Sequence, residues 1–256
     1  MERSAAAPSI LVVTPTYDRP GRIALLKRCI EAFCDVADLH WIVVEDGAAP
    51  HPAVADLLAE SGIRHTLLAH GPTHAWGNAG RDTALRHIRD HDLPGIVYLA
   101  DDDNYYEGPL FAELRRVKRV GVLPVGLLGP SGIERPILRG GRIAGWSAHW
   151  KSRRFPVDMA GFAFNATLLR GFSGPIWTYR ARGGETEFLE RLVTSADELE
   201  ILCDGCRRCH VWHDLPLGKT PKQALAAYRW RRRKDFIVGR VLRPLLASRR
   251  RESRAR

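Results

Sequence analysis

Long apolar runs are missing from this sequence of 256 residues. No stretch reaches the roughly 18 to 20 consecutive apolar residues that a helix needs to cross a bilayer. Residues 1–8 lack the apolar region of a signal peptide. Cysteine is scarce, and an odd count of five argues for free thiols over a disulfide framework. These absences argue against a membrane-spanning or disulfide-stapled protein, and we expect a cytoplasmic one.

An excess of charge is missing from most of the chain. The net charge is +10, from 39 Lys+Arg and 29 Asp+Glu. Residues 222–256 contain 13 basic and 2 acidic residues, a charge of +11, so 26 basic and 27 acidic residues, a charge of −1, remain in residues 1–221. The body therefore needs no polyanionic partner. We divide the chain into a domain of residues 1–221 and a basic tail of residues 222–256.

Alternating strand and helix patterns fill the first half of the chain. Runs of β-branched and apolar residues predict strands over 9–14, 40–45, 64–69 and 95–100, and helical spacing predicts helices over 21–34, 53–61 and 78–91. This order predicts an α/β fold with a mostly parallel sheet and crossover helices. Further on, residues 137–148 predict a hairpin that turns at Gly140-Gly141, 185–193 a helix and 209–213 a short strand.

Acidic residues follow the predicted strand over 95–100 directly, as Asp101, Asp102 and Asp103. Ligands bind beyond the carboxyl ends of such strands, and Tyr17 and Asp46 follow two other strand ends. Neighbouring carboxylates repel one another, and a divalent cation offsets that repulsion. Oxygen ligands suit Mg²⁺ or Mn²⁺, which could bridge a diphosphate. A solvated acidic turn is the alternative.

Six ordered blocks resemble the inverting glucuronosyltransferases of glycosyltransferase family 43, which add glucuronic acid in proteoglycan linker and carbohydrate-epitope synthesis. The blocks are residues 13–17 (VTPTY), 40–46 (HWIVVED), 97–104 (VYLADDDN), 124–127 (PVGL), 155–162 (FPVDMAGF) and 211–213 (VWH). The resemblance covers roughly residues 9–215. It implies a GT-A (nucleotide-diphospho-sugar transferase) fold, which is Rossmann-like with a mixed, mostly parallel sheet. It also implies a UDP-sugar donor and Mn²⁺, with Mg²⁺ as the alternative cofactor.

The resemblance also implies roles at a donor site. Tyr17, with Pro15 and Thr16, would stack on uracil, and Asp46 would accept a hydrogen bond from the uracil edge. Arg81 would reach the diphosphate and the glucuronate, Asp101 the ribose or sugar, and His213 would help to select the sugar, while Asp102 supports the site and Asp103 ligates the metal. Two family arginines are replaced here, by Trp76 and Leu215. A neutral sugar such as xylose is therefore an alternative donor sugar.

Acceptor and base residues are implied in the second half of the chain. Glu134 and Asp158 correspond to acceptor-binding carboxylates. Asp158 interrupts an apolar run, where an unpaired charge would be costly to bury, whereas Glu134 could belong to an ordinary loop. The base that takes the acceptor's proton would be Glu185, at a helix start after Arg182-Gly183, with Glu187 as the competitor. The alternative is that both glutamates only stabilise the N-terminus of the helix through its dipole and have no catalytic role.

Two features lie beyond this pattern. Cys203, Cys206, Cys209 and His210 could bind Zn²⁺, but the spacing is unusual and we favour reduced thiols. The basic, amphipathic tail predicts peripheral attachment to the inner face of the cell membrane. The alternative is that the tail is only a solvated basic end. Nucleic acid is the least favoured partner for the tail.

The sequence as a whole predicts an inverting, Mn²⁺-dependent glycosyltransferase that moves a sugar, with glucuronic acid favoured, from a UDP-sugar to a saccharide hydroxyl. A UDP-xylose-type donor is one alternative. A catalytically inactive GT-A module that binds nucleotide or glycan is another. The expected partners are the UDP-sugar, a saccharide or lipid-linked saccharide acceptor, an anionic membrane surface and a second copy in a homodimer.

Overall fold

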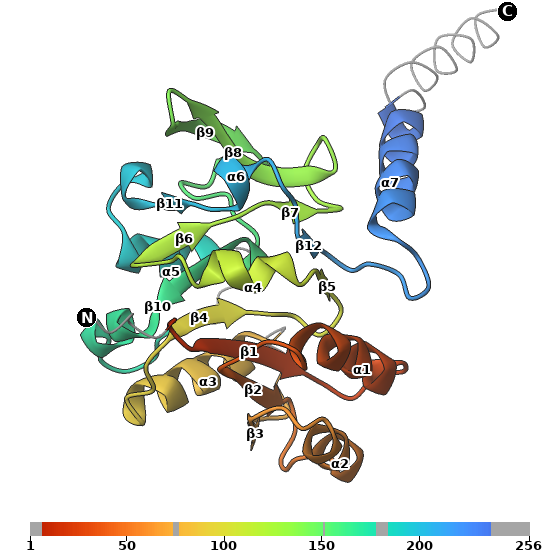
Figure 1. The fold of residues 1–256 in the computed structure, drawn as a ribbon, viewed down its shortest axis with the longest axis vertical. Helices are drawn as coiled ribbons and strands as arrows, with labels where there is room; N and C mark the ends of the chain where they lie inside the picture. Colours follow the sequence, from red (N-terminus) through yellow and green to blue (C-terminus); the bar gives the residue numbers. More distant parts are fainter. Residues whose placement is uncertain (1–6, 74–76, 151, 178–183, 237–256) are drawn as a thin grey trace, which may run out of the picture.

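The structure, a computed structural model, describes residues 7–73, 77–150, 152–177 and 184–236, the last range with side chains up to residue 232. Seven strands form the main sheet, in the order β11-β6-β10-β4-β1-β2-β3 (Figure 1). Their bounds are β1 Ile10–Thr16, β2 Leu39–Glu45, β3 His65–Ala69, β4 Ile96–Leu99, β6 Val120–Val122, β10 Phe162–Asn165 and β11 Glu200–Ile201. β10 is antiparallel to β4 and β6, and the other pairs are parallel. The predicted mixed, mostly parallel sheet is confirmed.

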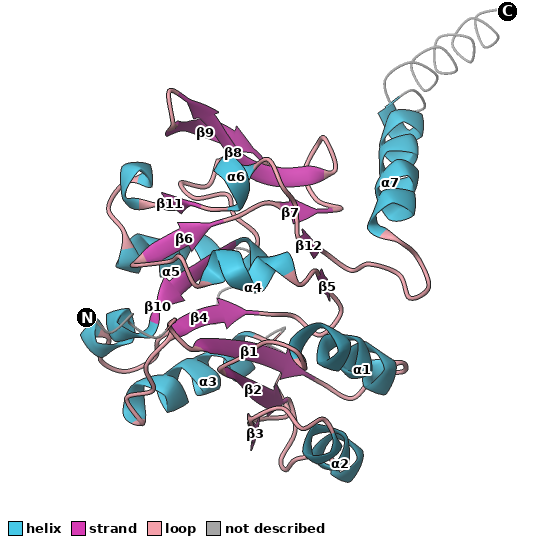
Figure 2. Ribbon diagram, viewed as in Figure 1, coloured by secondary structure: helices cyan, strands magenta, loops and turns pink. Residues whose placement is uncertain are grey.

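Helices cover both faces of this sheet (Figure 2). α1 (Arg22–Phe33), α2 (Pro52–Glu60) and α4 (Pro109–Leu114) contribute to one apolar cluster, and α3 (Asn78–Asp90) and α5 (Gly184–Leu192) to the other. Successive residues of β1 alternate between the two clusters, with Val12 in the first and Val13 in the second. A strand buried on both faces is apolar at every position, which explains the continuous run in the sequence.

A second, smaller sheet lies beside the first, in the order β5-β12-β7-β8-β9. It consists of β5 (Tyr105–Tyr106), β7 (Val125–Gly126), β8 (Ile133–Arg139), β9 (Arg142–Ser147) and β12 (Val211–Trp212). The predicted turn at Gly140-Gly141 joins β8 to β9, and both glycines have positive φ, +58° and +77°. The sequence did not predict that β5, directly after the aspartates, pairs with β12.

Short helices complete the described chain: η1 (Met159–Gly161), η2 (Ala166–Gly171), η3 (Ala196–Glu198) and α6 (Cys203–Cys206). The last described element, α7 (Pro221–Phe236), contacts the loop before β8, because Tyr228 Oη donates to the Gly129 carbonyl at 3.0 Å. The boundary at residue 221 stays a prediction. None of the helices within the described ranges has the length and apolar character needed to cross a membrane.

Candidate active site

The carboxyl ends of β1, β2 and β4 meet at one edge of the main sheet. The register aligns Thr16 with Glu45 and Val13 with Leu99. A cavity of about 130 Å³ opens beyond these ends. Its lining includes eight residues singled out from the sequence: Pro15, Thr16, Tyr17, Asp46, Arg81, Asp101, Asp102 and Asp103. The predicted donor residues other than His213 therefore surround one space, at the edge where parallel sheets bind ligands.

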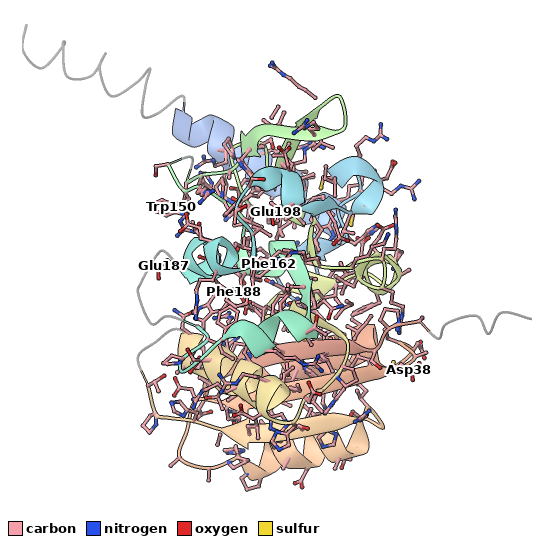
Figure 3. The ribbon with its side chains drawn as sticks, turned by 90° about the vertical axis from the view of Figure 1, so that its left-hand side faces the viewer. Asp38, Trp150, Phe162, Glu187, Phe188 and Glu198 are labelled. Carbon is pink, nitrogen blue, oxygen red and sulfur yellow. The ribbon has the colours of Figure 1, made fainter. Side chains whose placement is uncertain are left out.

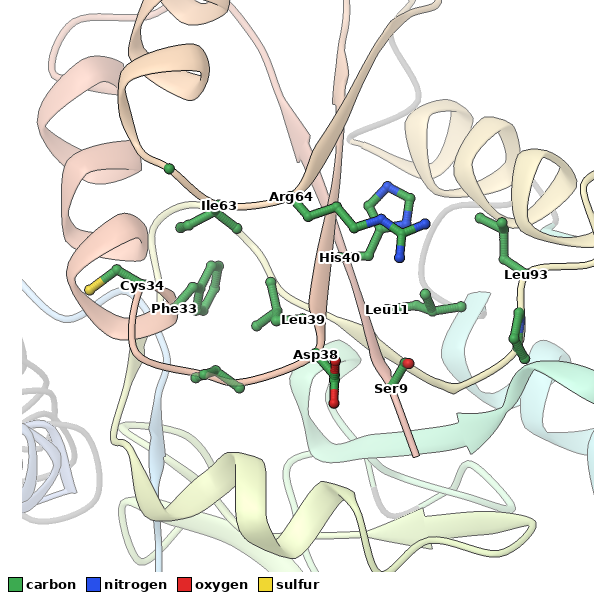
Figure 4. A pocket seen from close by; sticks show the side chains of 13 residues that line it. Ser9, Leu11, Phe33, Cys34, Asp38, Leu39, His40, Ile63, Arg64 and Leu93 are labelled. Carbon is green, nitrogen blue, oxygen red and sulfur yellow. The ribbon is translucent and has the colours of Figure 1, made fainter. Parts of the chain in front are cut away.

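A larger cavity, of about 320 Å³, lies at the opposite edge, where β1 and β2 begin (Figure 4). Apolar side chains such as Leu11 and Leu39 line it together with polar ones that include Asp38, His40 and Arg64. Burial, together with the charge of Arg64, lowers the pKa of His40 to about 4, so this imidazole is neutral at pH 7. We place the candidate site at the smaller cavity because it holds the aspartate triad.

Asp102 is held in place from β1 and the loop that follows it. Its carboxylate accepts hydrogen bonds from Thr16 Oγ1 at 2.6 Å and from both terminal nitrogens of Arg19, at 2.6 and 3.1 Å. The Arg19 guanidinium also lies 4.4 Å from the centre of the Tyr17 ring. Arg19 thus contacts both the Tyr17 ring and the carboxylate of Asp102. Sequence reasoning missed Arg19, although it lies only two positions after Tyr17.

Asp46 lies at the end of β2 and accepts hydrogen bonds from the Thr73 backbone N–H at 2.6 Å and from Thr73 Oγ1 at 3.0 Å. Gly71 makes this approach possible, because a Cβ there would lie 2.1 Å from Asp46 Oδ1. The carboxylate is oriented by the loop after β3, which the sequence gave no reason to connect with it. Each carboxylate oxygen retains a lone pair for a further donor.

Arg81 projects from the first turns of α3 and forms an ion pair with Asp101. Two glycines allow this helix to approach the sheet. Gly77 precedes the helix with φ +78°, and a Cβ at Gly80 would lie 3.2 Å from Pro15 Cβ. Arg81 is buried, with 5% of its surface exposed. Arg81 is therefore not a solvated residue on the outer face of the helix.

Asp103 is the most accessible carboxylate of the aspartate triad, with 39% of its side chain exposed. Burial of the group and the charges of Asp101 and Asp102 raise its pKa to about 6, against the pull of His213 and Arg19. Its backbone carbonyl accepts a hydrogen bond of 2.6 Å from Arg28. A cation beside Asp103 would relieve the repulsion that raises this pKa.

His213 comes from the end of β12, where its backbone N–H donates to the Gly126 carbonyl at 3.0 Å. Burial lowers the pKa of this imidazole, but the charges of Asp158, Asp101 and Asp103 outweigh burial and raise it overall. Its Nδ1 is buried without a hydrogen-bond partner among the described residues. The ring therefore senses the charge of both Asp158 and the triad, although it does not line the cavity at the triad.

The two predicted acceptor carboxylates lie together in a cleft, which Trp146 and Gly161 also line. Burial and the charge of Asp158 raise the pKa of Glu134 to about 7. Asp158 also has a structural role that sequence reasoning did not include. Its Oδ1 accepts a hydrogen bond of 3.0 Å from the Ala160 N–H and caps η1.

Glu185 lies in the first turn of α5, and its Oε2 is 3.2 Å from Arg153 Nη1. Burial raises the pKa of this carboxyl, while Arg153 and Arg81 pull it down. In Figure 3, Phe188 of the same helix lies in the core and Glu187 near the edge of the molecule. Arg182-Gly183, which the base assignment used, and Trp76 lie outside the described residues. Sequence reasoning did not predict the pairing with Arg153.

The cysteine cluster does not have the geometry of a metal site in the described residues. All five cysteines are free, and burial raises the pKa of Cys203, Cys206 and Cys209 to about 12. His210 Nδ1 instead lies 3.0 Å from a Glu107 carboxylate oxygen. Within the described ranges, no three His, Cys, Asp or Glu side chains converge as a protein-built metal site requires. The structure therefore favours the reduced thiols over the zinc alternative.

Sequence comparison identifies a family and several relatives that this chain resembles over most of its length. The chain matches the description "Glycosyltransferase family 43" over residues 29–215. It is 38% identical over 225 residues to "Galactosylgalactosylxylosylprotein 3-beta-glucuronosyltransferase 2" of Rattus norvegicus, covering 80% of this chain and 68% of that protein. It is 39% identical over 245 residues to "Galactosylgalactosylxylosylprotein 3-beta-glucuronosyltransferase I" of Drosophila melanogaster, covering 86% and 78%.

Solved structures show the same fold at low sequence identity. S. aureus TarS 1-349 matches with a TM-score of 0.53 and 14% identity, covering 91% of this chain and 75% of that chain. The mannosyltransferase PcManGT from Pyrobaculum calidifontis, in complex with GDP-Man and Mn²⁺, matches with a TM-score of 0.53 and 17% identity, covering 84% and 59%. These likenesses show that the chain has the GT-A fold.

Proposed function

The chain belongs to glycosyltransferase family 43, and from this we propose that it transfers glucuronic acid from UDP-glucuronic acid to a saccharide hydroxyl, with inversion at the anomeric carbon. Family membership makes the chain a glycosyltransferase. The donor, the cation and the roles of individual residues are the proposal. Relatives named as 3-beta-glucuronosyltransferases support glucuronic acid as the transferred sugar.

The position of Arg81 is the observation that carries the proposal. Its guanidinium pairs with Asp101 in the donor cavity. Burial raises the pKa of Asp158 and Glu185, and the charge of Arg81 opposes that rise at both carboxyls. Arg81 therefore lies where donor, acceptor and base must meet for direct displacement. A guanidinium suits a diphosphate or a sugar carboxylate, because it offers paired donors in one plane.

The nucleotide would bind between Tyr17 and Asp46. The Tyr17 ring is 54% exposed and has Arg19 in cation–π contact, so an aromatic base could stack on its open surface. Asp46, held by Thr73, would accept a hydrogen bond from the uracil edge. Two elements far apart in the chain would thus fix the position of the base.

The residues present fit a divalent cation held jointly by protein and donor. Asp102 is engaged by Arg19 at 2.6 Å, and Asp101 by Arg81. Arg19 lies 3.9 Å from Asp103 Oδ2, so Asp103 is the least engaged of the three carboxylates and the one offered to a cation. One carboxylate together with substrate phosphates and waters is a usual arrangement for Mg²⁺. Bound there, Mn²⁺ or Mg²⁺ would neutralise charge on the diphosphate as it leaves.

Glu185 would act as the base of a single displacement. Its carboxylate takes the proton of the acceptor hydroxyl, the acceptor oxygen forms a bond to the anomeric carbon, and the bond from that carbon to the UDP oxygen breaks. Glu134 and Asp158 would hold the acceptor sugar by its other hydroxyls. Glu187, on the same helix, stays the competing assignment for the base.

A UDP-xylose donor is a second candidate, and Leu215 favours it. This residue is 2% exposed and packs with Trp212, so the position of a family arginine carries no side-chain charge. Its backbone carbonyl accepts a hydrogen bond from Arg28. Both terminal nitrogens of Arg28 donate to backbone oxygens, those of Leu215 and Asp103, so Arg28 is not oriented to bind a sugar carboxylate as the family arginine would.

A donor screen tests the proposal. Purified protein with Mn²⁺ and a galactoside acceptor is given UDP-glucuronic acid, UDP-xylose, UDP-glucose or UDP-galactose, and UDP release is measured. The acceptor follows the galactosyl wording of the relatives' names. We expect turnover with UDP-glucuronic acid and a β-linked product by NMR, with Glu185→Gln as the inactive control. Turnover of UDP-xylose alone would replace the donor, and an α-linked product would refute inversion.

A further inference from the structure

We propose that α7 is a docking surface for an anionic phospholipid bilayer. The first observation is its charge. Residues 221–232 contain Lys222, Arg229, Arg231 and Arg232 and no acidic residue. The sequence from residue 222 to the end carries +11, against −1 for the rest of the chain. Clusters of basic residues of this size are attracted to anionic headgroups.

The second observation is that α7 has one face occupied by the body and the opposite face exposed. Ala224, Leu225 and Tyr228 face the body, where Ala224 is 8% exposed and Tyr228 bonds to Gly129. Trp230 follows Tyr228 by two positions, a rotation of about 200° around a helix with 3.6 residues per turn. Trp230 is 63% exposed, so its ring lies on the outward face.

A tryptophan among arginines has the chemistry of a membrane interface. Its ring is apolar, its N–H can remain among the polar headgroups, and it is enriched at that depth. Leu217, 54% exposed, lies four residues before α7 begins. Nucleic acid would also attract the charge, but the exposed apolar side chains favour a bilayer.

The third observation is that α7 is held against the loops that flank β8 and β9, the strands that carry Glu134 and Trp146 of the acceptor cleft. Arg229 Nε donates to the Ser131 carbonyl at 3.0 Å, and His149 Nε2 lies 3.4 Å from Tyr228 Oη. In Figure 3, Trp150 lies on the side of the molecule from which α7 emerges. Resting on the proposed function, a bilayer bound by α7 would present a lipid-linked saccharide on the acceptor side.

The experiment measures vesicle binding without turnover, so that its failure is distinct from a failure of the proposed function. The full chain is co-sedimented with vesicles of phosphatidylcholine alone or with 30 mol% phosphatidylglycerol. We expect binding only to the anionic vesicles and a steep loss as salt rises from 50 to 500 mM. Arg231→Gln with Arg232→Gln should lower the partition coefficient by about 30-fold.

The matched control removes two arginines elsewhere. Arg207 and Arg208 are each 73% exposed and directly follow α6 in the chain. Figure 1 shows α6 and α7 as separate elements. Arg207→Gln with Arg208→Gln gives the same net charge as the α7 variant and should leave vesicle binding within about twofold. Trp230→Ala should weaken binding while UDP affinity stays at the wild-type value, which shows that the variant is folded.

Three results would overturn the proposal. The first is the absence of binding to anionic vesicles at 50 mM salt. The second is an equal loss of binding in the α7 variant and its control, since net charge alone would then explain it. The third is tight binding of a DNA duplex that resists salt better than vesicle binding does, because the helix would then serve nucleic acid.

Discussion

Arg153 Nη1 lies 3.2 Å from Glu185 Oε2, and it joins the loop before β10 to the first turn of α5. The two side chains are 16% and 20% exposed, so water screens their attraction only in part. The positive charge favours the carboxylate form of Glu185 and opposes the effect of burial on its pKa. Arg153 is therefore a positioning residue that favours the ionised form of the proposed base against the effect of burial.

The first prediction removes this charge. Arg153→Met should raise the pKa of Glu185, so the acidic limb of the kcat–pH profile should move upward by about one unit. At pH 8 and above, activity should recover towards the wild-type value. Arg154→Met is the control, because Arg154 lies beside it and bonds a backbone carbonyl. An acidic limb that stays in place with Arg153→Met would remove this arginine from the control of the base.

The second prediction separates the two candidate bases. Glu185→Gln should lower kcat by about 10² to 10⁴, the contribution of a general base. UDP affinity should stay within twofold, because the substitution is isosteric and lies outside the donor cavity. Glu187→Gln on the same helix should leave kcat nearly unchanged. The reverse pattern, measured by UDP release with saturating acceptor, would assign the base to Glu187.

The third prediction concerns the cation at Asp103. Asp103→Ala should abolish the gain in UDP affinity that Mn²⁺ gives, a loss of about 100-fold or more. Without Mn²⁺, UDP should bind at least as well as to the wild type, since one repelling carboxylate is gone. Titration calorimetry of UDP binding, with and without Mn²⁺, measures both affinities. A Mn²⁺ effect that survives in Asp103→Ala would assign the cation to another residue.

The fourth prediction is a pH dependence of stability. The pKa of Glu134 is raised to about 7 by burial, so the folded state binds a proton more tightly than the unfolded state. Its contribution to stability is fully present below the unfolded pKa of about 4.5 and is lost as pH rises through 7. The loss is at most about 3 kcal/mol in the free energy of unfolding.

Glu134→Gln should remove this dependence. Its free energy of unfolding in urea should fall less between pH 5 and pH 8 than that of the wild type. Glu187→Gln serves as the control, because it makes the same side-chain change outside the cleft that Glu134 lines. Parallel stability curves for the wild type and Glu134→Gln would show that Glu134 is not the titrating group.

The sequence predicted the parts of this site that depend on strand ends. The aspartate triad, Tyr17 and Asp46 each follow an apolar run, and parallel strands must bring such ends to one edge. The pairings of Asp46 with Thr73 and of Glu185 with Arg153 were not predictable. They connect residues 27 and 32 positions apart through loops whose paths no local pattern fixes.

Asp158 and α7 show the same limit. The cost of burying a charge correctly drew attention to Asp158, but a capping hydrogen bond to Ala160 offsets part of that cost. The composition of the tail gave its charge, whereas the contacts of Tyr228 that orient α7 arise from tertiary packing. Local sequence patterns determine which helices and strands form. The contacts of a side chain depend on how those helices and strands pack against one another.

The last prediction tests Arg19, which serves both Asp102 and Tyr17. Arg19→Ala leaves the carboxylate of Asp102, 4% exposed, with Thr16 as its remaining side-chain donor. The free energy of unfolding should fall by about 1 to 3 kcal/mol, because a buried charge loses its main partner. UDP affinity should fall as well, since the Tyr17 ring loses the guanidinium that lies against it.

Adding Asp102→Asn to Arg19→Ala separates the two roles. The double variant buries no unpaired charge, so urea unfolding should show most of the lost stability restored. UDP affinity should stay low, because the ring contact is still missing. Recovery of both quantities together would mean that Arg19 acts on the nucleotide only by neutralising Asp102, and the contact with Tyr17 would then have no part in binding.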